Sequence, residues 1–159
     1  MAANKSKLRK LAKAVADVLA SGCAADELNP TFTPRLRWVP AESLKTLTSL
    51  AVNVAPASMT SKRLTRVAAE RHLFVGIQVA KKITQASQAA FDAEVDDLMV
   101  LVESIDAWLL DERNKSVTDD AHNRYSLVGV QIVEALDWEL LEESRTFQSV
   151  LLLEYFHAI

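Results

Sequence analysis

Apolar and polar residues alternate along residues 67–83, VAAERHLFVGIQVAKKI. The apolar side chains fall mainly on odd positions and the polar ones on even positions, which predicts a β-strand with one solvent-exposed face. The β-branched residues Val75, Ile77 and Val79 favour a pleated strand over a helix. Gly76, in the middle of the run, predicts a bulge or a close approach of another backbone. We expect the rest of the fold to be arranged around this strand.

A first amphipathic helix is predicted over residues 5–21, where apolar side chains recur at spacings of three and four. Asn4 or Ser6 is expected to cap its start, and Gly22 is expected to end it. Several basic residues lie near its start, where the helix dipole disfavours positive charge. These residues predict either an acidic partner or a solvated face: Lys5, Lys7, Arg9, Lys10 and Lys13.

A second helix is predicted over residues 91–109, with an apolar stripe wide enough to be buried across a sheet. Asp92 is the expected N-cap. The next carboxylates would then lie in the first turn and complement the helix dipole: Glu94, Asp96 and Asp97. Residues 92–112 contain eight carboxylates and no basic residue, so the outer face of this helix is expected to be strongly negative.

Shorter alternating runs predict further strands before the central one. Residues 35–38 form a short strand between prolines, which suits a sheet edge. Residues 50–54 form a second strand that Pro56 closes. We expect a turn at residues 41–47 and an exposed hairpin loop at residues 57–65.

The C-terminal part of the chain continues the alternation. Residues 114–124 are polar and expected to form a loop, and residues 127–133 form a strand. Residues 137–143 form an acidic turn with some helical character. The last strand, residues 147–156, is apolar on both faces, so it is either central in the sheet or covered by another subunit.

These elements predict an α/β chain of the α+β kind. We expect a mostly antiparallel sheet with an amphipathic helix packed across one face, plus an N-terminal helix and arm. A length of 159 residues favours a single domain, 1–159. Within it we expect the N-terminal helix at 5–22, an arm and linker at 23–47, and a sheet-and-helix core at 48–159.

Composition narrows the class of protein. Half of the residues are hydrophobic and a quarter are charged, as in soluble globular proteins. A net charge of -3 argues against a protein whose whole surface binds nucleic acid. Cys23 is the only cysteine, so no internal disulfide can form. No apolar run approaches the roughly 18 residues needed to span a bilayer, so no membrane partner is expected.

The residues needed for common catalytic and metal sites do not cluster in the sequence. His72, His122 and His157 lie in unrelated elements without the spacing of metal ligands. The few glycines are too far apart for a phosphate-binding loop, and no nucleophile elbow occurs. We therefore expect no metal, no cofactor and no enzymatic activity, although folding could still assemble a site from distant residues.

The order of the predicted elements, together with three local features, carries a resemblance to a known family. The features are Val54-Ala55-Pro56, the arginine-rich stretch from Arg63 to Arg71, and Asp137-Trp138-Glu139 ahead of Phe147. In these respects the chain resembles the tail terminator and tail-completion proteins of long-tailed bacteriophages. It differs in a longer segment between the first helix and Leu50 and in an unusually basic first helix.

The resemblance implies a homo-oligomeric ring, most often a hexamer, that caps the tail tube. Its partners would be the tail tube protein and a head connector or neck protein, with transient contact to passing DNA. The expected location is the head–tail junction of the virion, after synthesis in the bacterial cytoplasm. Charged patches and strands that are apolar on both faces suggest these residues for the protein–protein interfaces: Lys5, Arg9, Lys13, Arg35, Arg37, Trp38, Lys62, Arg63, Arg66, Asp96, Asp97, Val150 and Leu152.

Other functions are compatible with the same patterns. The chain could be a neck or head-completion protein that joins the connector to the tail without ending the tube. It could be a small nucleic-acid-binding protein that uses the basic N-terminal helix, residues 5–13, and the basic stretch 62–71. An unrelated assembly or regulatory module, and an enzyme whose site forms only on folding, are the remaining alternatives.

Overall fold

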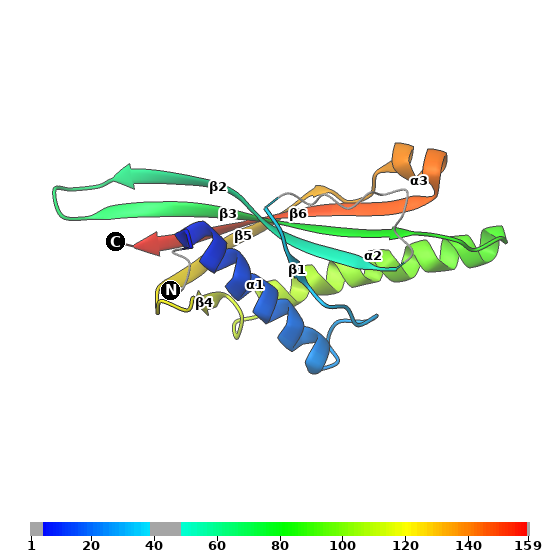
Figure 1. Ribbon diagram of the computed structural model, residues 1–159, viewed down its shortest axis with the longest axis horizontal. Coiled ribbons are helices and arrows are strands. Elements are labelled where there is room, and N and C mark those ends of the chain that lie inside the picture. Colours follow the sequence, from blue (N-terminus) through cyan, green and yellow to red (C-terminus); the bar gives the residue numbers. More distant parts are fainter. Residues whose placement is uncertain (1–4, 39–48, 159) are drawn as a thin grey trace.

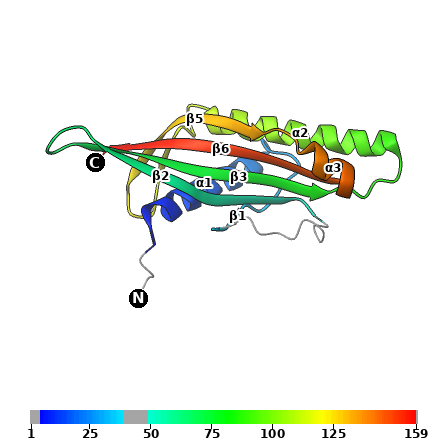
Figure 2. The same ribbon diagram turned by 90° about the horizontal axis from the view of Figure 1, so that it is seen from above.

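The computed structural model describes residues 5–38 and 49–158. In chain order the elements are α1 (Lys7–Ala24), β1 (Arg35–Leu36), β2 (Ala51–Arg63), β3 (Ala69–Lys82), α2 (Gln88–Leu110), β4 (Ser116–Thr118), β5 (Arg124–Glu134), α3 (Trp138–Ser144) and β6 (Thr146–Ala158). The predicted turn at residues 41–47 and the candidate cap Asn4 lie outside the described residues. Figures 1 and 2 show the arrangement.

The strands form one sheet in the order β1-β2-β3-β6-β5-β4. Every pairing is antiparallel except that of β1 with β2. The sheet curls into a half-barrel, and α1 and α2 lie on the same face of it (Figures 1 and 2). This arrangement confirms the predicted α+β class, with a mostly antiparallel sheet and a helix across one face.

The core lies between the two long helices and the sheet. The odd-numbered apolar residues of β3 from Leu73 to Val79 are fully buried there, as the alternation predicted. The apolar stripe of α2 supplies Leu98, Val102 and Ile105, which are also buried. One cluster of buried residues joins the side chains of α1, α2 and the sheet.

The hairpin between β2 and β3 is longer than the sequence indicated. Strand β2 does not end at Pro56 but continues to Arg63, so the predicted loop at 57–65 is wrong. The described pairing of β1 with β2 ends at Val54, so none of the residues that the structure describes needs the missing N–H of Pro56 on that side. A register shift between Pro56 and Ser58 accommodates the ring and bends the strand. Gly76 stays in regular pairing, and a Cβ added there would be 3.8 Å from the Ala55 oxygen, so the predicted bulge lies on the opposite strand.

Helix α1 ends later than expected, and helix α2 begins earlier than expected. Helix α1 runs through Gly22 to Ala24, and Ser6 caps its start by accepting a hydrogen bond from the Arg9 amide. Gly22 is there for space, since a Cβ would come within 2.7 Å of Leu28 Cδ1. The prediction that Gly22 ends the helix was therefore wrong.

Helix α2 begins at Gln88, three residues before its predicted start at Phe91. Ser87 is the N-cap, and its hydroxyl accepts a hydrogen bond from the Ala90 amide. Asp92 is therefore not the cap, and the first turn contains no acidic residue. The carboxylates of the helix lie further along it, where they set the charge of its surface rather than stabilise its start.

The C-terminal elements agree with the predicted order, with one addition. The loop expected at residues 114–124 contains the short strand β4, which pairs with the start of β5. The acidic turn is the short helix α3, capped by Asp137. Strand β6 is central, between β3 and β5, as the first of the two alternatives given for it predicted.

Candidate protein–protein interface

The residues predicted to form interfaces lie in separate places on the molecule. Lys5, Arg9 and Lys13 lie on or just before α1; Arg35, Arg37 and Trp38 lie on or just after β1; Lys62, Arg63 and Arg66 lie at the tip of the β2–β3 hairpin; Asp96 and Asp97 lie on α2; Val150 and Leu152 lie on β6. The structure brings the hairpin residues together and places Arg9 against Trp38. It does not gather the whole set into one surface.

Part of the positive charge of α1 is paired within the chain. Lys13 Nζ lies 3.1 Å from Asp17 Oδ2 and 3.7 Å from Asp120 Oδ1. The hydrogen bond to Asp17, helped by the charge of both carboxylates, raises the pKa of Lys13. The Arg9 guanidinium lies 5.5 Å from the centre of the Trp38 ring. The free cationic surface of α1 is therefore smaller than its sequence suggests.

Neither α1 nor α2 covers the opposite face of the sheet, and the short helix α3 stands at one end of it, at the start of β6 (Figures 1 and 2). Val150 and Leu152 point to this face and are only partly buried, while their neighbours Leu151 and Leu153 are fully buried on the other side. Two hollows lie on this open face. One of about 230 Å³ adjoins Val150, and one of about 160 Å³ adjoins Leu152.

A ladder of amide side chains crosses this side of the sheet over three strands, from the buried Asn53 on β2 to the partly exposed Gln148 on β6. Asn53 Nδ2 donates to Gln78 Oε1 at 3.1 Å, and Gln78 Nε2 donates to Gln148 Oε1 at 3.0 Å. Asn53 is fully buried, yet its Oδ1 accepts no hydrogen bond. A buried carbonyl oxygen without a donor is costly, so this end of the ladder is less stable than the rest.

His72 lies at the far end of the same face and is satisfied by its neighbours. Its Nδ1 is 2.7 Å from Glu154 Oε1, and its Nε2 is 3.8 Å from Glu70 Oε1. The ring also meets Phe156 edge-on, with ring centres 5.8 Å apart. The imidazole is hydrogen-bonded through Nδ1, and its Nε2 lies near a second carboxylate.

The tip of the β2–β3 hairpin, residues 64–68, is a compact turn that extends past the end of β6 (Figure 1). The Leu64 and Thr65 amides donate to the Ala68 oxygen at 3.0 and 3.1 Å, and Thr65 Oγ1 accepts from the Ala68 amide at 2.9 Å. The Arg63 guanidinium donates to the backbone oxygens of Thr65 and Arg66 at 3.1 and 3.2 Å. Arg63 therefore holds the turn, and its charge is partly used within the tip.

This ordered tip holds apolar side chains in solvent. Val67 is 95% exposed, Leu64 is 53% exposed, and Met59 on the adjoining part of β2 is 49% exposed. The hydrophobic effect disfavours such exposure, and a rigid turn loses little entropy when it binds. Sequence reasoning placed residues 57–65 in a loop and Val67 in the strand that follows. The placement of Val67 was wrong, because β3 begins at Ala69.

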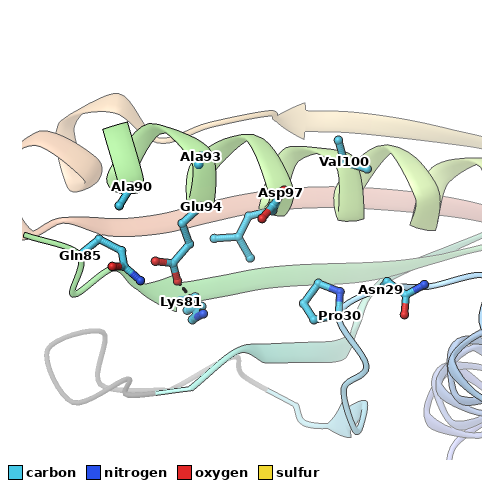
Figure 3. A pocket seen from close by; sticks show the side chains of 10 residues that line it. Asn29, Pro30, Lys81, Gln85, Ala90, Ala93, Glu94, Asp97 and Val100 are labelled. Carbon is cyan, nitrogen blue, oxygen red and sulfur yellow. Dashed lines mark ion pairs between the residues drawn. The ribbon is translucent and has the colours of Figure 1, made fainter. Parts of the chain in front are cut away.

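A groove of about 810 Å³ runs beside the N-terminal half of α2 (Figure 3). Asn29 and Pro30 lie on one side of it, and α2 lies on the other with Ala90, Ala93, Glu94, Asp97, Leu98 and Val100. Lys81 Nζ, on β3, is 2.6 Å from Glu94 Oε1. Glu94 Oε2 is buried without a hydrogen-bond partner. Of the residues predicted as interface, the groove includes Asp97 and not Asp96.

A polar cluster that sequence reasoning missed closes the loop between β4 and β5. The buried carboxylate of Asp119 accepts hydrogen bonds from the Ala121 and Asn123 amides, both at 2.9 Å, and from the Tyr125 hydroxyl at 3.0 Å. Burial alone would raise the pKa of Asp119, but these bonds and those from the Asn123 side chain lower it. Burial, with the bond to Asp119, raises the pKa of Tyr125. The Asp-x-x-x-Asn spacing was the available signal for this turn.

Over residues 5–38 and 49–158, no group of three or more His, Cys, Asp or Glu side chains could hold a metal ion. Among the helices of these same residues, none combines the length and the apolarity needed to cross a bilayer. The sites with distinctive geometry are therefore surfaces: the open sheet face, the hairpin tip and the α2 groove. Apolar surface beside unpaired polar groups is chemically suited to binding another polypeptide.

Neither a scan against models of known protein families nor a search of curated proteins found a match to this chain.

Proposed function

We propose that this chain is a structural subunit of a phage virion, a tail terminator that forms a ring at the end of the tail tube and joins it to the head connector. The observation that carries the proposal is the open face of the sheet. A curled sheet that buries one face under its own helices and leaves apolar hollows beside Val150 and Leu152 has a second face suited to other subunits. The resemblance in element order supports the choice of the phage family.

The function follows from how rings stack. Tube rings join through repeated, head-to-tail interfaces, and such interfaces extend without limit unless something ends them. A ring that matches the tube on one side and presents a different surface on the other stops the addition. The separation of charge in this chain, basic near the hairpin tip and acidic along α2, gives the different surfaces that such a ring requires.

The test is assembly with the tail tube protein. Purified chain would be mixed with polymerising tube protein, and the tubes would be examined by negative-stain electron microscopy. We expect tubes whose growth stops and whose ends carry an added ring. Uncapped tubes that keep growing, with the chain bound only to connector particles, would instead indicate a neck or head-completion protein.

A variant links this test to the open face. Leu152→Asp places a charge beside the hollow on β6 while leaving the buried side of the strand unchanged. We expect the variant to remain folded by circular dichroism and to lose its place on the tube end. Glu103→Arg, a change of charge at an exposed position on α2, is the control and should cap tubes normally.

A further inference from the structure

The hairpin tip cannot be explained by contacts within one chain. Val67, almost fully exposed, and Leu64 stand on a turn that Thr65 and Arg63 hold in place by hydrogen bonds. Arg66 donates no side-chain hydrogen bond and forms no ion pair within the described residues. The tip is thus an ordered projection with an apolar centre and a free cation.

This chemistry favours a protein partner over nucleic acid. Proteins that bind single strands stack bases on aromatic side chains, and residues 59–71 contain none. Because Arg63 is engaged within the turn, Lys62 and Arg66 are the remaining cations at the tip, which is few for a phosphate-driven contact. An exposed valine flanked by an arginine instead fits an apolar groove edged by a carboxylate.

The α2 groove has that complementary character. Ala90, Ala93 and Val100 give it an apolar wall, and Val100 is 58% exposed. Asp97 adds a carboxylate with no ion-pair partner among the described residues, and the buried Glu94 Oε2 lacks a donor. Figure 3 shows the acidic side chains and Val100 along the same stretch of helix.

The tip and the groove lie at opposite ends of the longest axis of the molecule (Figure 1). A chain therefore cannot place its own tip in its own groove. Two surfaces of different shape and opposite charge on one chain can meet only between copies, in a head-to-tail contact.

We propose that the hairpin tip, residues 64–68, docks into the α2 groove of a second copy of this chain, with Val67 on the apolar wall and Arg66 paired with Asp97. The contact deepens the proposed function, because it names the contact between neighbouring subunits of the ring. A turn of five residues buries less surface than a stable interface needs, so it acts together with the open sheet face.

Charge reversal tests the pairing. Arg66→Glu should weaken self-association, measured by sedimentation equilibrium, by about tenfold, because it places two acids face to face. Adding Asp97→Arg in the same chain should restore most of the lost affinity. The matched controls are Lys115→Glu for the tip and Glu103→Arg for the helix, both exposed outside the two surfaces. Unchanged association of Arg66→Glu, or equal weakening by the controls, would overturn the contact.

Cross-linking gives a second measurement that does not depend on affinity. In a Cys23→Ser background, chains carrying Val67→Cys are mixed with chains carrying Ala93→Cys and oxidised. We expect a disulfide-linked pair in the mixture and little in either chain alone. Val67→Cys mixed with Val128→Cys, an exposed site on β5, is the control. The proposal would be contradicted if Val67→Cys and Ala93→Cys gave no more disulfide than this control. It would also be contradicted if added single-stranded DNA, but not a second copy of the chain, protected the thiol introduced at position 67 from oxidation.

The failure of this contact and the failure of the proposed function give different results. A chain that carries both Val67→Cys and Ala93→Cys should give, on oxidation, a series of disulfide-linked oligomers whose largest member has as many chains as the ring. A series that stops at a pair would support docking but contradict the ring. Tubes capped normally by Arg66→Glu chains, with no cross-link, would overturn the docking and leave the terminator function standing.

Discussion

The two faces of the central strands have the same backbone but different surroundings. On one face, residues such as Val75 and Leu151 are fully buried beneath α1 and α2. On the other, Gln78, Gln148 and Leu152 are only partly buried. The first face supplies the stability of the subunit. The second face has the mixed apolar and amide surface expected where subunits meet.

The largest expected effect separates two single variants at adjacent leucines, one on each face of β6. Leu151→Ala, on the covered face, should lower the free energy of unfolding by about 3 kcal/mol, because it leaves a cavity in the core. Leu152→Ala, on the open face, should cost less than about 1 kcal/mol in the isolated subunit. Urea denaturation followed by circular dichroism measures both. Equal losses would show that the two faces belong to one core.

A smaller effect is expected at the edge of the covered face, where Asp119 accepts a hydrogen bond from the Tyr125 hydroxyl. Asp119→Asn should lower the free energy of unfolding by about 2 kcal/mol at neutral pH, because hydrogen bonds to the charged carboxylate are lost. The folded state lowers the pKa of Asp119 below 3.8, so its stabilisation is present above that pH and is lost as pH falls through the folded pKa.

The measurement is urea denaturation of both proteins between neutral and acidic pH. The difference between wild type and Asp119→Asn should shrink as pH falls below about 4, since the wild-type carboxylate becomes protonated. A difference that stays constant down to acidic pH would contradict the assigned role of the charge.

Replacing two glycines by alanine should change the stability in opposite directions, because one position is closely packed and the other is open. Gly22→Ala should destabilise the subunit by about 1 kcal/mol, because the added Cβ would come within 2.8 Å of the Trp108 indole nitrogen. The gain in helix propensity offsets part of the clash. Gly129→Ala meets nothing within 4 Å and should stabilise by about 0.5 kcal/mol. Thermal unfolding would detect both, and shifts of the same sign would refute the packing argument at Gly22.

The smallest change removes the unsatisfied end of the amide ladder. Asn53→Val deletes a buried oxygen that has no donor and adds a β-branched side chain to β2. The partner Gln78 is partly exposed and can turn to solvent. We expect the free energy of unfolding to rise by a few tenths of a kcal/mol to about 1 kcal/mol. A marked loss in urea denaturation would mean that the ladder stabilises the subunit itself.

Periodicity located the elements because it reports local backbone geometry. The alternation of residues 67–83 and the stripe of residues 91–109 identified β3 and α2, since side-chain direction repeats every two residues in a strand and about every 3.6 in a helix. The ends were less certain. Ser87, not Asp92, caps α2, because several nearby residues could serve as a cap and the sequence does not rank them.

The sites that carry the proposals depended on contacts between distant residues. The extension of β2 through Pro56 depends on β1 ending at Leu36, opposite Val54, and the amide ladder depends on the register of three strands. The α2 groove exists because residues 29–30 come to lie across from the helix. Side-chain alternation is set by neighbours in the chain, so the sequence determined which faces are apolar. Burial, register and grooves are set by residues far away in the chain, so only the tertiary structure decided which apolar face became the core and which stayed partly exposed.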